Sequence, residues 1–407
     1  MRVLYLCHRI PYPPNKGDKI RAFHQLRAMA ARHEVDLFTL TDEGVNPAHR
    51  AALAEFCHGV TVVPLNPLWA RLRSLPFLFS GKALTLPYFY SAELAAEIRK
   101  ALLMRSYDRI FVYCSAMAQY VEQIDQIPVI LDLVDVDSDK WTQYASAARL
   151  PWSAIYQREG IRLREYEREI CEKVSRVLVS TEREAELLRG ISPSAPVQVI
   201  PNGVGAEFFE GSPALSAAAA PAVVFTGDMS YFPNQEAVIF FALQVLPLIR
   251  QSQPDARFLI VGRNPARNVL RLQNIPGVEV TGYVPDVRTY LAQARVSVAP
   301  FSIAAGIQNK IIEAMAYGLP VVATSRAIQG LSTSVAEMVE TGNSPGELAA
   351  KILRLLDDAE LARQTGSEGR RRVRADYNWE HALSKVLETL ENPGRADMRM
   401  AEAHSSV

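Results

Sequence analysis

The sequence has no excess of either charge. Its 44 lysines and arginines are matched by 44 aspartates and glutamates, so the formal net charge is zero. A protein that binds nucleic acid or another polyanion through a broad electrostatic surface needs a basic excess, and we expect no nucleic-acid partner. Hydrophobic residues make up 49% of the chain and charged residues 22%, which is typical of a globular protein. A chain of 407 residues is long enough for two cores of ordinary size.

Cysteine is scarce, and its spacing fits neither a disulfide framework nor a metal site. The four cysteines are Cys7, Cys57, Cys114 and Cys171. Three of them lie in or beside apolar runs, which indicates buried thiols. His8 and His24 are expected to be partly buried neighbours of a strand and a helix rather than ligands. We therefore expect no metal and no cofactor.

Long apolar runs are absent as well. No stretch of the sequence reaches the roughly 18 apolar residues that a membrane-spanning helix needs. The opening Met1–Cys7 is a short strand-like run followed by prolines, and it lacks the longer apolar core of a signal peptide. The sequence therefore predicts a cytoplasmic protein.

One apolar segment, Leu75–Phe79, has two interpretations. Arg71, Arg73 and Lys82 surround it, and no acidic residue occurs from Asn66 to Ser91. Such a segment could make peripheral contact with the inner membrane surface. Core packing explains its aromatic side chains at least as well, and the pattern slightly favours the core.

Short apolar runs alternate with segments of helical period along the whole chain. This alternation predicts an α/β protein of two Rossmann-like, doubly wound domains. We expect an N-terminal domain in residues 1–200, a second domain in residues 201–376, a terminal helix in residues 377–391 that packs back on the first domain, and a disordered tail in residues 392–407. Two such domains place the ligand in a cleft that faces the carboxyl ends of both sheets.

The first expected strand runs into a proline- and glycine-rich loop and then into a helix. Such a junction presents free backbone N–H groups and the positive end of the helix dipole, which attract anions. Gly17 permits close approach of a phosphate or a sugar, and Asp18 follows it at the start of the helix. A plain turn in which Asp18 caps the helix is an equally good interpretation.

A stronger signal occupies Gly306–Ala323, which predicts a loop, a short helix, a glycine stop and a buried strand. The helix N-terminus would again face an anion, and Lys310 adds a mobile positive charge. Glu313 follows on the same helical face, where a carboxylate can accept both hydroxyls of a ribose. An ordinary surface glutamate is the alternative, although the small and apolar neighbours disfavour a solvated face.

These residues carry a family resemblance. The chain resembles the retaining GT-B glycosyltransferases of family four, which include the phosphatidylinositol mannosyltransferases. The segments that agree are, in order, Met1–Gly17, Val199–Val204, the strand ending in Val261-Gly262, Val280–Val284, Glu313–Ala316 and Asn378–Glu380. Three further segments, Phe225–Met229, Asp132–Ser138 and Gly306–Lys310, resemble the exosortase- or PEP-CTERM-associated sugar transferases of exopolysaccharide loci.

The resemblance implies a role for each matching position. Glu313 matches the second glutamate of the family's Glu–seven residues–Glu motif and should hold the nucleotide ribose. Gly17 matches a glycine near the donor diphosphate and the acceptor, and Tyr283 and Val284 match the backbone that meets the nucleobase. The loop around the donor sugar and phosphates corresponds to Gly306, Ile307, Gln308 and Asn309.

Two departures from the family pattern concern the donor site. Ala305 stands where the first glutamate of the motif would fall. The arginine and lysine that usually follow the strand ending at Gly227 are missing, since Asp228–Asn234 contains neither. The diphosphate must then be neutralised differently, with Lys310 and Arg263 as candidates, although Arg263 is slightly better explained as solvent-exposed.

Two acids follow a buried strand of the first domain. Asp135 and Asp137 come after Val129–Leu133, which places them at the carboxyl end of the sheet. The family often has a histidine or an aspartate in this region, where an acid could orient the acceptor hydroxyl or stabilise transition-state charge. Asp135 is our first candidate for a catalytic residue and Asp137 the second, although aspartates after strands also cap helices.

The sequence thus predicts a transferase that moves a hexosyl unit from a nucleotide-sugar donor to a polysaccharide or lipid-linked acceptor. By resemblance, it retains the anomeric configuration and serves exopolysaccharide biosynthesis. The rival enzyme class is a sugar-nucleotide epimerase of GT-B shape. The rival non-enzyme class is a catalytically degraded transferase that serves as an assembly partner, against which the intact Gly17, Lys310 and Glu313 argue.

Overall fold

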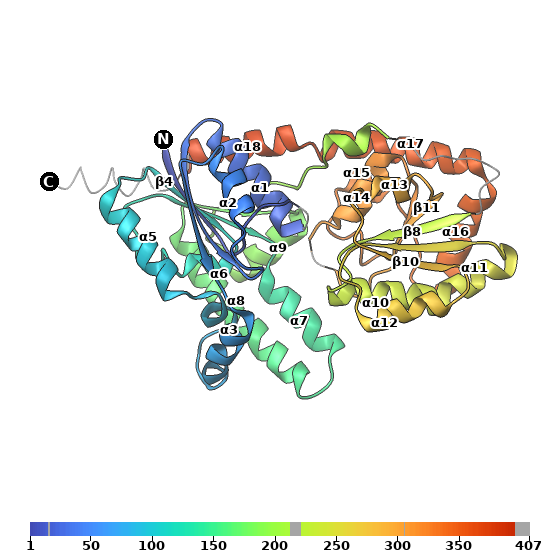
Figure 1. The fold of residues 1–407 in the computed structure, drawn as a ribbon, viewed down its shortest axis with the longest axis horizontal. Helices are drawn as coiled ribbons and strands as arrows, with labels where there is room; N and C mark the ends of the chain where they lie inside the picture. Colours follow the sequence, from blue (N-terminus) through green and yellow to red (C-terminus); the bar gives the residue numbers. More distant parts are fainter. Residues whose placement is uncertain (15–16, 212–220, 305, 395–407) are drawn as a thin grey trace. The chain divides into compact units, whose positions relative to one another are not determined.

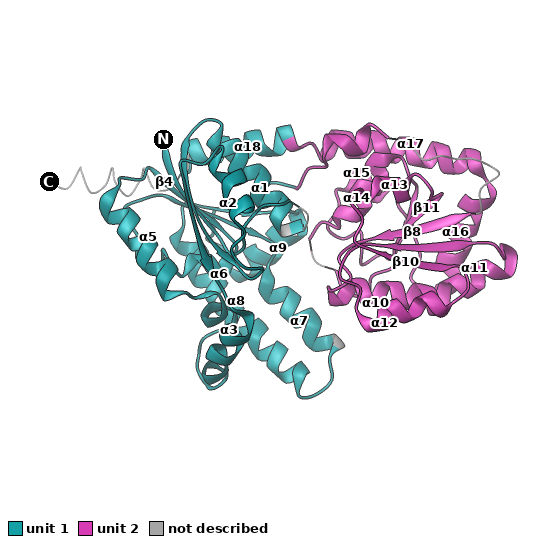
Figure 2. Ribbon diagram, viewed as in Figure 1, with its two compact units in different colours: residues 1–201, 380–407 teal, residues 202–379 magenta. Residues whose placement is uncertain are grey.

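The computed structural model describes residues 1–14, 17–211, 221–304 and 306–394. The chain divides into two compact units, which Figure 2 shows in different colours. Unit 1 comprises Met1–Pro201 and the C-terminal segment from Glu380, and unit 2 comprises Asn202–Trp379. Ala305 and the part of the expected tail beyond residue 394 lie outside the described residues.

Unit 1 is built on a seven-stranded sheet in which every strand runs parallel to its neighbour. The strand order is β3-β2-β1-β4-β5-β6-β7. The strands are β1 (Arg2–Cys7), β2 (Glu34–Thr41), β3 (Gly59–Pro64), β4 (Arg109–Tyr113), β5 (Val129–Val134), β6 (Arg176–Val179) and β7 (Val197–Val199). Most are short runs rich in valine, leucine and isoleucine, as expected of strands covered on both faces.

Helices connect these strands and flank the sheet (Figure 1). They are α1 (Gly17–Ala30), α2 (Pro47–Ala54), α3 (Pro67–Ser74), the 3-10 helix η1 (Leu75–Phe79), α4 (Thr85–Phe89), α5 (Ala92–Met104), α6 (Ser115–Ala118), α7 (Asp137–Ala147), α8 (Trp152–Lys173) and α9 (Glu182–Ile191).

The C-terminal helix α18 (Trp379–Glu391) also packs on unit 1. The Arg109 guanidinium donates to the Leu390 carbonyl over 3.0 Å, and the Thr389 hydroxyl donates to Gln198 over 3.0 Å. Val386, Leu387 and Leu390 are buried. Unit 1 is therefore assembled from the two ends of the chain.

A buried ion pair joins α1 to the sheet of unit 1. The Arg21 Nε lies 2.8 Å from Asp132 Oδ2 on β5, and both side chains are fully buried. Gln25 donates to the same carboxylate oxygen, and a second Arg21 nitrogen donates to the Ile200 carbonyl over 2.8 Å. These contacts fix α1, β5 and the end of the β7 segment relative to one another.

Unit 2 has a six-stranded parallel sheet in the order β10-β9-β8-β11-β12-β13. The strands are β8 (Ala222–Thr226), β9 (Arg257–Val261), β10 (Val278–Gly282), β11 (Val296–Ala299), β12 (Val321–Ala323) and β13 (Glu340–Thr341). The helices are the 3-10 helix η2 (Ala206–Phe209), α10 (Phe232–Phe240), the π-helical turn η3 (Phe241–Val245), α11 (Leu246–Ser252), α12 (Arg267–Leu270), the 3-10 helix η4 (Arg271–Asn274), α13 (Arg288–Leu291), α14 (Asn309–Tyr317), α15 (Thr333–Ala336), α16 (Pro345–Asp357) and α17 (Ala359–Asp376).

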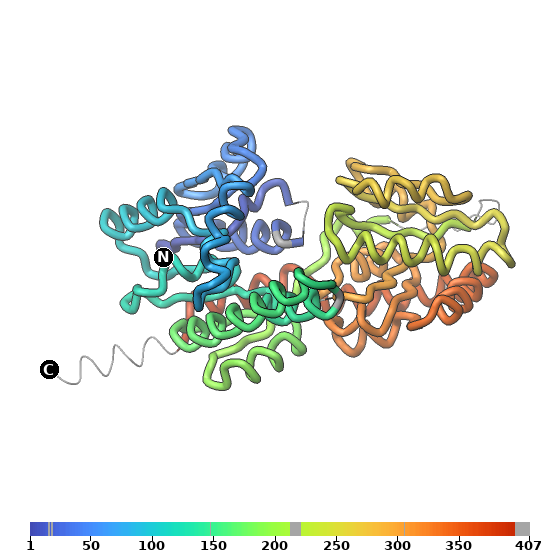
Figure 3. The backbone as a smooth tube through the Cα atoms, turned by 90° about the horizontal axis from the view of Figure 1, so that it is seen from below, coloured from blue at the N-terminus to red at the C-terminus, as the bar shows by residue number. Residues whose placement is uncertain are grey.

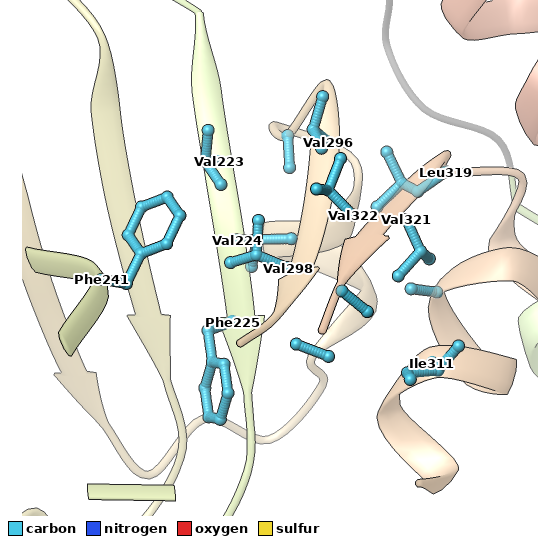
Figure 4. Close-up of a cluster of buried hydrophobic side chains, with 14 of the residues drawn as sticks. Val223, Val224, Phe225, Phe241, Val296, Val298, Ile311, Leu319, Val321 and Val322 are labelled. Carbon is cyan, nitrogen blue, oxygen red and sulfur yellow. The ribbon is translucent and has the colours of Figure 1, made fainter. Parts of the chain in front are cut away.

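The core of unit 2 is formed where helices pack on the central strands. Figure 4 shows valines of β8, β11 and β12 meeting Phe225, Phe241 and Ile311. All of these side chains are buried. Branched side chains suit this position because they fill the pleated surface between sheet and helix. The prediction of two Rossmann-like parallel-sheet domains is confirmed.

One helical stretch of unit 2 is longer and more apolar than the sequence analysis expected. Phe232–Ser252, which combines α10, η3 and α11, is long and apolar enough to cross a membrane by length and composition. The expectation of no such stretch was therefore wrong. Val238, Phe241, Val245 and Ile249 are fully buried in the core of unit 2, so this stretch serves as a core helix here. Its course can be followed in the tube view of Figure 3.

We expect the variant Arg21→Met to destabilise unit 1 by about 3–5 kcal/mol, because it leaves the Asp132 carboxylate buried without its cation. The control Arg27→Met removes an exposed arginine from the same helix and should cost at most about 1 kcal/mol. Urea unfolding followed by circular dichroism measures both changes. Equal stability of the two variants would show that the buried pair contributes no more than a surface charge.

Candidate active site

The strand order of each sheet reverses at one point. In unit 1 the reversal lies between β1 and β4, and in unit 2 it lies between β8 and β11. At such a point the loops that leave the carboxyl ends of the two strands diverge and open a crevice for ligands. The residues expected at the donor site follow β8, β9, β10 and β11, and Gly17 follows β1. Each unit thus gathers its own candidate residues at one edge of its sheet.

Lys310 lies at this edge of unit 2, in the first turn of α14. Its Nζ is 4.9 Å from the ring centre of Phe225 and 4.5 Å from that of Phe301, and it donates to Asn234 Oδ1 over 2.8 Å. The two rings offer cation–π attraction, and the amide oxygen accepts a hydrogen bond. The ammonium is therefore held in place, which corrects the expectation of a mobile charge.

Glu313 follows one turn later on α14 and is partly buried. Burial raises the pKa of Glu313 to about 7, and the positive charge of Lys310 opposes that rise. Burial lowers the pKa of Lys310 to about 7, and the charge of Glu313 opposes that fall. Both groups therefore change charge near neutral pH, so a ligand that contacts them can settle their protonation.

Two glycines bring the carboxyl ends of β8 and β9 together. Gly262 has a φ of 149°, and a β-carbon placed on it would lie 1.7 Å from the carbonyl oxygen of Gly227. The Gly227 N–H donates to the Val261 carbonyl over 2.9 Å. A β-carbon on Gly227 would in turn lie 2.8 Å from the Asn234 amide nitrogen. The close approach therefore places the Gly227 backbone beside the side chain that holds Lys310.

Arg263 is turned toward an acid of its own unit. Its Nε lies 3.0 Å from Asp228 Oδ2, and both side chains are largely buried. Burial favours the neutral form of Asp228, but bonds from Ser230 and Arg263 outweigh it and lower the pKa of Asp228. Arg263 is therefore not the solvent-exposed residue that the sequence favoured. A diphosphate would have to compete with Asp228 for it.

The remaining donor candidates lie on the loops around α14 and after β10. Gly306 is buried with a φ of 57°, and Ile307 packs against the core of unit 2. Gln308 precedes α14 without capping it through its side chain, and Asn309 accepts a hydrogen bond from Asn202 over 3.2 Å. After β10, Tyr283 is largely exposed, whereas Val284 packs against the core.

In unit 1, Asp135 follows a strained end of β5. Val134 has a φ of 66°, and the Asp135 N–H donates to the Leu133 carbonyl, which closes a three-residue turn. A β-branched residue rarely adopts this conformation, which costs of the order of 1–3 kcal/mol. The turn directs the Asp135 side chain to the Ser180 hydroxyl, which donates to it over 3.0 Å. Burial and the charge of Asp137 raise the pKa of Asp135, although Lys140 and Ser180 oppose this rise.

Asp137 begins α7 beside this turn, and the Ser115 hydroxyl donates to it over 3.4 Å. Two buried glutamates that the sequence analysis missed lie nearby. Glu184 accepts from the Val136 N–H over 2.7 Å, and burial and the charge of Asp135 raise its pKa to about 7. Glu167 accepts from Ser138, and burial raises its pKa to about 8. Their only sequence signal is an acid on the buried face of a helix.

The loop after β1 contributes less to the described site. Gly17 is exposed and opens α1, and Asp18 lies in the first turn of that helix, with its side chain outside the description. His8 stacks on Tyr113 with ring centres 5.9 Å apart and meets the edge of Phe89, as expected of a partly buried neighbour. Within the described residues no group of three or more histidines, cysteines or acids is arranged to hold a metal ion.

Comparisons with known families address the nature of both units. Residues 19–203 match the family model described as Glycosyl transferase 4-like domain. Residues 220–358 match the model described as Glycosyl transferases group 1. The chain carries two glycosyltransferase domains of the GT-B type.

Curated relatives of these glycosyltransferase domains include two mannosyltransferases. One is the GDP-mannose-dependent monoacylated alpha-(1-6)-phosphatidylinositol monomannoside mannosyltransferase of Corynebacterium glutamicum, 27% identical over 38% of this chain and 43% of the relative. The other is the GDP-mannose-dependent alpha-(1-6)-phosphatidylinositol monomannoside mannosyltransferase of Mycobacterium tuberculosis, 26% identical over 54% of this chain and 62% of the relative. The match thus spans less than two thirds of the length of either relative.

Solved structures share the fold over almost the whole chain. Sucrose-phosphate synthase from Thermosynechococcus elongatus has a TM-score of 0.70 at 20% identity and covers 95% of this chain and 98% of its own. HepE from Anabaena, solved in complex with UDP-glucose, has a TM-score of 0.67 at 18% identity and covers 96% of this chain and 99% of its own.

Two segments that carry the family resemblance, Val199–Val204 and Asn378–Glu380, contact each other in the structure. A β-carbon on Gly203 would lie 2.4 Å from the Trp379 side chain, so only glycine allows this approach. Val204 forms a β-bridge with Asn378, and its N–H donates to the Tyr377 carbonyl over 3.0 Å. Residues from the two ends of unit 2 therefore lie side by side.

We expect Gly262→Ala to destabilise the group 1 glycosyltransferase domain by about 3 kcal/mol or more. The new β-carbon would meet the Gly227 carbonyl and would also force a side chain into a strained backbone conformation. Gly346→Ala is the matched control, because a β-carbon there meets nothing within 4 Å and alanine suits a helix better than glycine. Thermal and denaturant unfolding report the difference, and a Gly262→Ala protein as stable as its control would show that the two turns can separate freely.

Proposed function

We propose that this chain is a nucleotide-sugar-dependent glycosyltransferase that moves a hexosyl unit to a polysaccharide or lipid-linked acceptor. The arrangement of Lys310 and Glu313 carries the proposal. They place a cation and an anion one turn apart on α14, beside the strand-order reversal of a group 1 glycosyltransferase domain. The donor's diphosphate needs the cation, and its ribose hydroxyls need the carboxylate.

We assign the donor to unit 2. The diphosphate would lie at the N-terminus of α14, where backbone N–H groups and the helix dipole favour negative charge, with Lys310 beside it. Glu313 would accept the ribose hydroxyls, and Tyr283 and Val284 would meet the nucleobase. Gly227 and the loop Gly306–Asn309 would approach the phosphates and the sugar through their backbone.

The reaction breaks the bond between the anomeric carbon and the diphosphate oxygen, and the leaving nucleoside diphosphate takes the electron pair. A hydroxyl oxygen of the acceptor forms the new bond to the anomeric carbon, and its proton passes to an oxygen of the departing diphosphate. Negative charge therefore grows on the leaving diphosphate, where Lys310 and the α14 N-terminus stabilise it more in the transition state than in the ground state. By the resemblance to family four, the new bond forms with retention of configuration.

We assign the acceptor to unit 1, with Gly17 near the acceptor. Asp135 would orient the acceptor hydroxyl, and Asp137 is the second candidate for this role. The strained turn at Val134 and the bond from Ser180 support Asp135, because they hold its carboxyl group in one orientation. Its raised pKa favours a protonated form, which can donate a hydrogen bond as well as accept one.

The resemblance to the exosortase-associated transferases supports a role in exopolysaccharide biosynthesis. The mannosyltransferases among the relatives carry names that specify GDP-mannose and phosphatidylinositol monomannoside, and HepE was solved with UDP-glucose. GDP-mannose and UDP-glucose are therefore the first donors to test, with lipid-linked acceptors first among acceptors. We further propose that the enzyme works in the cytoplasm, at the inner face of the membrane.

A thermal-shift screen of nucleoside diphosphates and nucleotide sugars, with and without magnesium, tests donor binding. At a hundredfold excess over its dissociation constant a ligand adds about 2.7 kcal/mol of stability, so the melting temperature should rise in the presence of chelator as well. Incubation of the stabilising donor with lipid-linked acceptors should then yield the glycosylated product and the nucleoside diphosphate. Stabilisation that requires a divalent ion would contradict a metal-independent donor site.

The same experiment separates the two rival functions. An epimerase would convert the donor sugar without needing an acceptor. An assembly partner that has lost catalysis would neither cleave the donor nor transfer its sugar.

We expect donor affinity to be highest near pH 7 and to fall on both sides. Above about pH 7 Lys310 loses the proton that attracts the diphosphate, and below about pH 7 Glu313 gains a proton and no longer accepts two hydroxyls. A nucleotide sugar is the right probe, because its diphosphate is esterified at both ends and does not titrate in this range. Isothermal titration calorimetry over a pH series measures the profile.

The variant Glu313→Gln distinguishes the contribution of Glu313 to donor affinity from that of Lys310. It should lower donor affinity roughly ten- to a hundredfold, because a hydrogen bond to a charged acceptor contributes about 1.5–3 kcal/mol. It should also remove the loss of affinity on the acidic side. Lys310→Met should instead remove the loss on the alkaline side. Glu337→Gln, at an exposed acid of the same unit, is the control and should leave the profile unchanged; an unchanged profile in Glu313→Gln would falsify the ribose assignment.

A further inference from the structure

A row of large apolar side chains stands exposed on unit 1, along α3 and η1. We call Leu68, Trp69, Leu72, Leu75 and Phe79 the apolar ridge. Phe79 is 96% exposed and Trp69 71% exposed, and the other three are more than half exposed. Single exposed apolar residues are common on protein surfaces, but a continuous group usually marks an interaction site. The sequence pattern favoured core packing for Leu75–Phe79, and for Leu75 and Phe79 that prediction was wrong.

The ridge is held from beneath by polar contacts rather than by burial of its own side chains. Arg73 donates to the Pro87 carbonyl over 2.7 Å and also to the carbonyl of Tyr90. Arg158 of α8 donates to the carbonyls of Phe77 and Ser80, each over 2.6 Å. These bonds fix the backbone of η1 against the body of unit 1. The apolar side chains are thereby presented outward at little further cost in conformational entropy.

The charge within the segment that carries the ridge is of one sign, whereas Glu165 and Glu169 of α8 line a pocket together with Lys82. Arg71 and Lys82 are exposed beside the ridge, and the sequence contains no acid from Asn66 to Ser91. Tryptophan, phenylalanine and leucine flanked by lysine and arginine form the composition that binds at the interface of an anionic bilayer. A second copy of the chain fits less well, because a symmetric contact would bring the same cations together.

We propose that the apolar ridge inserts into the surface of an anionic lipid bilayer, with Arg71 and Lys82 against the lipid phosphates. This interaction goes beyond the proposed sugar transfer and requires neither donor nor acceptor. It holds unit 1 at the surface where a lipid-linked acceptor resides.

Co-flotation with vesicles tests the proposal. The wild-type chain should float with vesicles of phosphatidylcholine and phosphatidylglycerol and much less with phosphatidylcholine alone. The double variant Trp69→Ser, Phe79→Ser should lower the partition coefficient about a hundredfold, since each large apolar side chain contributes roughly tenfold. Arg71→Ser, Lys82→Ser should lower it about fivefold per charge and should weaken its dependence on salt.

The matched control is Leu103→Ser, Met104→Ser at the end of α5. It removes apolar side chains of similar exposure, 82% and 73%, from another surface of the same unit, and it should leave vesicle binding unchanged. All of these side chains are exposed, so melting curves should match the wild type. Quenching of tryptophan fluorescence by brominated lipid should fall in Trp69→Phe, which locates the contact on the ridge.

Three results would overturn the proposal. The first is a wild-type chain that does not float with anionic vesicles, and the second is a ridge variant that floats as well as its control. Lipid-free sedimentation could instead reveal self-association that the ridge variant abolishes, which would make the ridge an interface between copies of the chain. Because no vesicle assay contains a donor, none of these results bears on sugar transfer, and a failure of transfer to a soluble acceptor leaves the vesicle assays interpretable.

Discussion

In each sheet every strand runs in the same direction as its neighbour, so all strand-to-helix loops leave the sheet at one edge. This parallel pairing forces residues far apart in the sequence into one neighbourhood. In unit 2 it brings Gly227, Gly262 and Lys310 together although they follow β8, β9 and β11. In unit 1 it places Asp135 after β5 beside Ser180 after β6. The candidate chemistry of both units depends on this arrangement.

Burial shifts the pKa values of the polar groups in both candidate sites. Burial opposes charge on both Lys310 and Glu313, and each partly restores the charge of the other. The acids near the end of β5 show a related effect, because burial raises the pKa of Asp135, of Glu167 on α8 and of Glu184 on α9. Substrate groups that contact these side chains can therefore shift their protonation.

Many of the strands and helices can be predicted from the sequence, because local patterns specify local structure. Met1–Cys7 and Val129–Leu133 read as buried strands because their apolar runs are short and bounded by turn residues, and β1 and β5 lie there. The helix within Gly306–Ala323 ends at Gly318, whose φ of 94° favours glycine. The functional roles of these residues can be inferred from the sequence only through the family resemblance and the charge of the side chains.

Other features depend on packing between distant segments and leave no local signal. The rings that hold Lys310 come from β8 and from the loop after β11, and Asn234 comes from α10. Phe79 is exposed in a segment whose backbone is held by hydrogen bonds from Arg158 on α8. An apolar run in the sequence does not show such a contact. The sequence favoured a solvent-exposed Arg263 because its partner Asp228 follows β8, whereas Arg263 follows β9.

The assembly of unit 1 from both ends of the chain has a consequence for synthesis on the ribosome. The carbonyl of Leu390 that binds Arg109, and the Thr389 hydroxyl that binds Gln198, are made only after every residue of unit 2. Domains tend to fold in the order in which they emerge. Unit 1 is therefore the first to be synthesised in part and the last to be completed, because α18 is synthesised after the whole of unit 2.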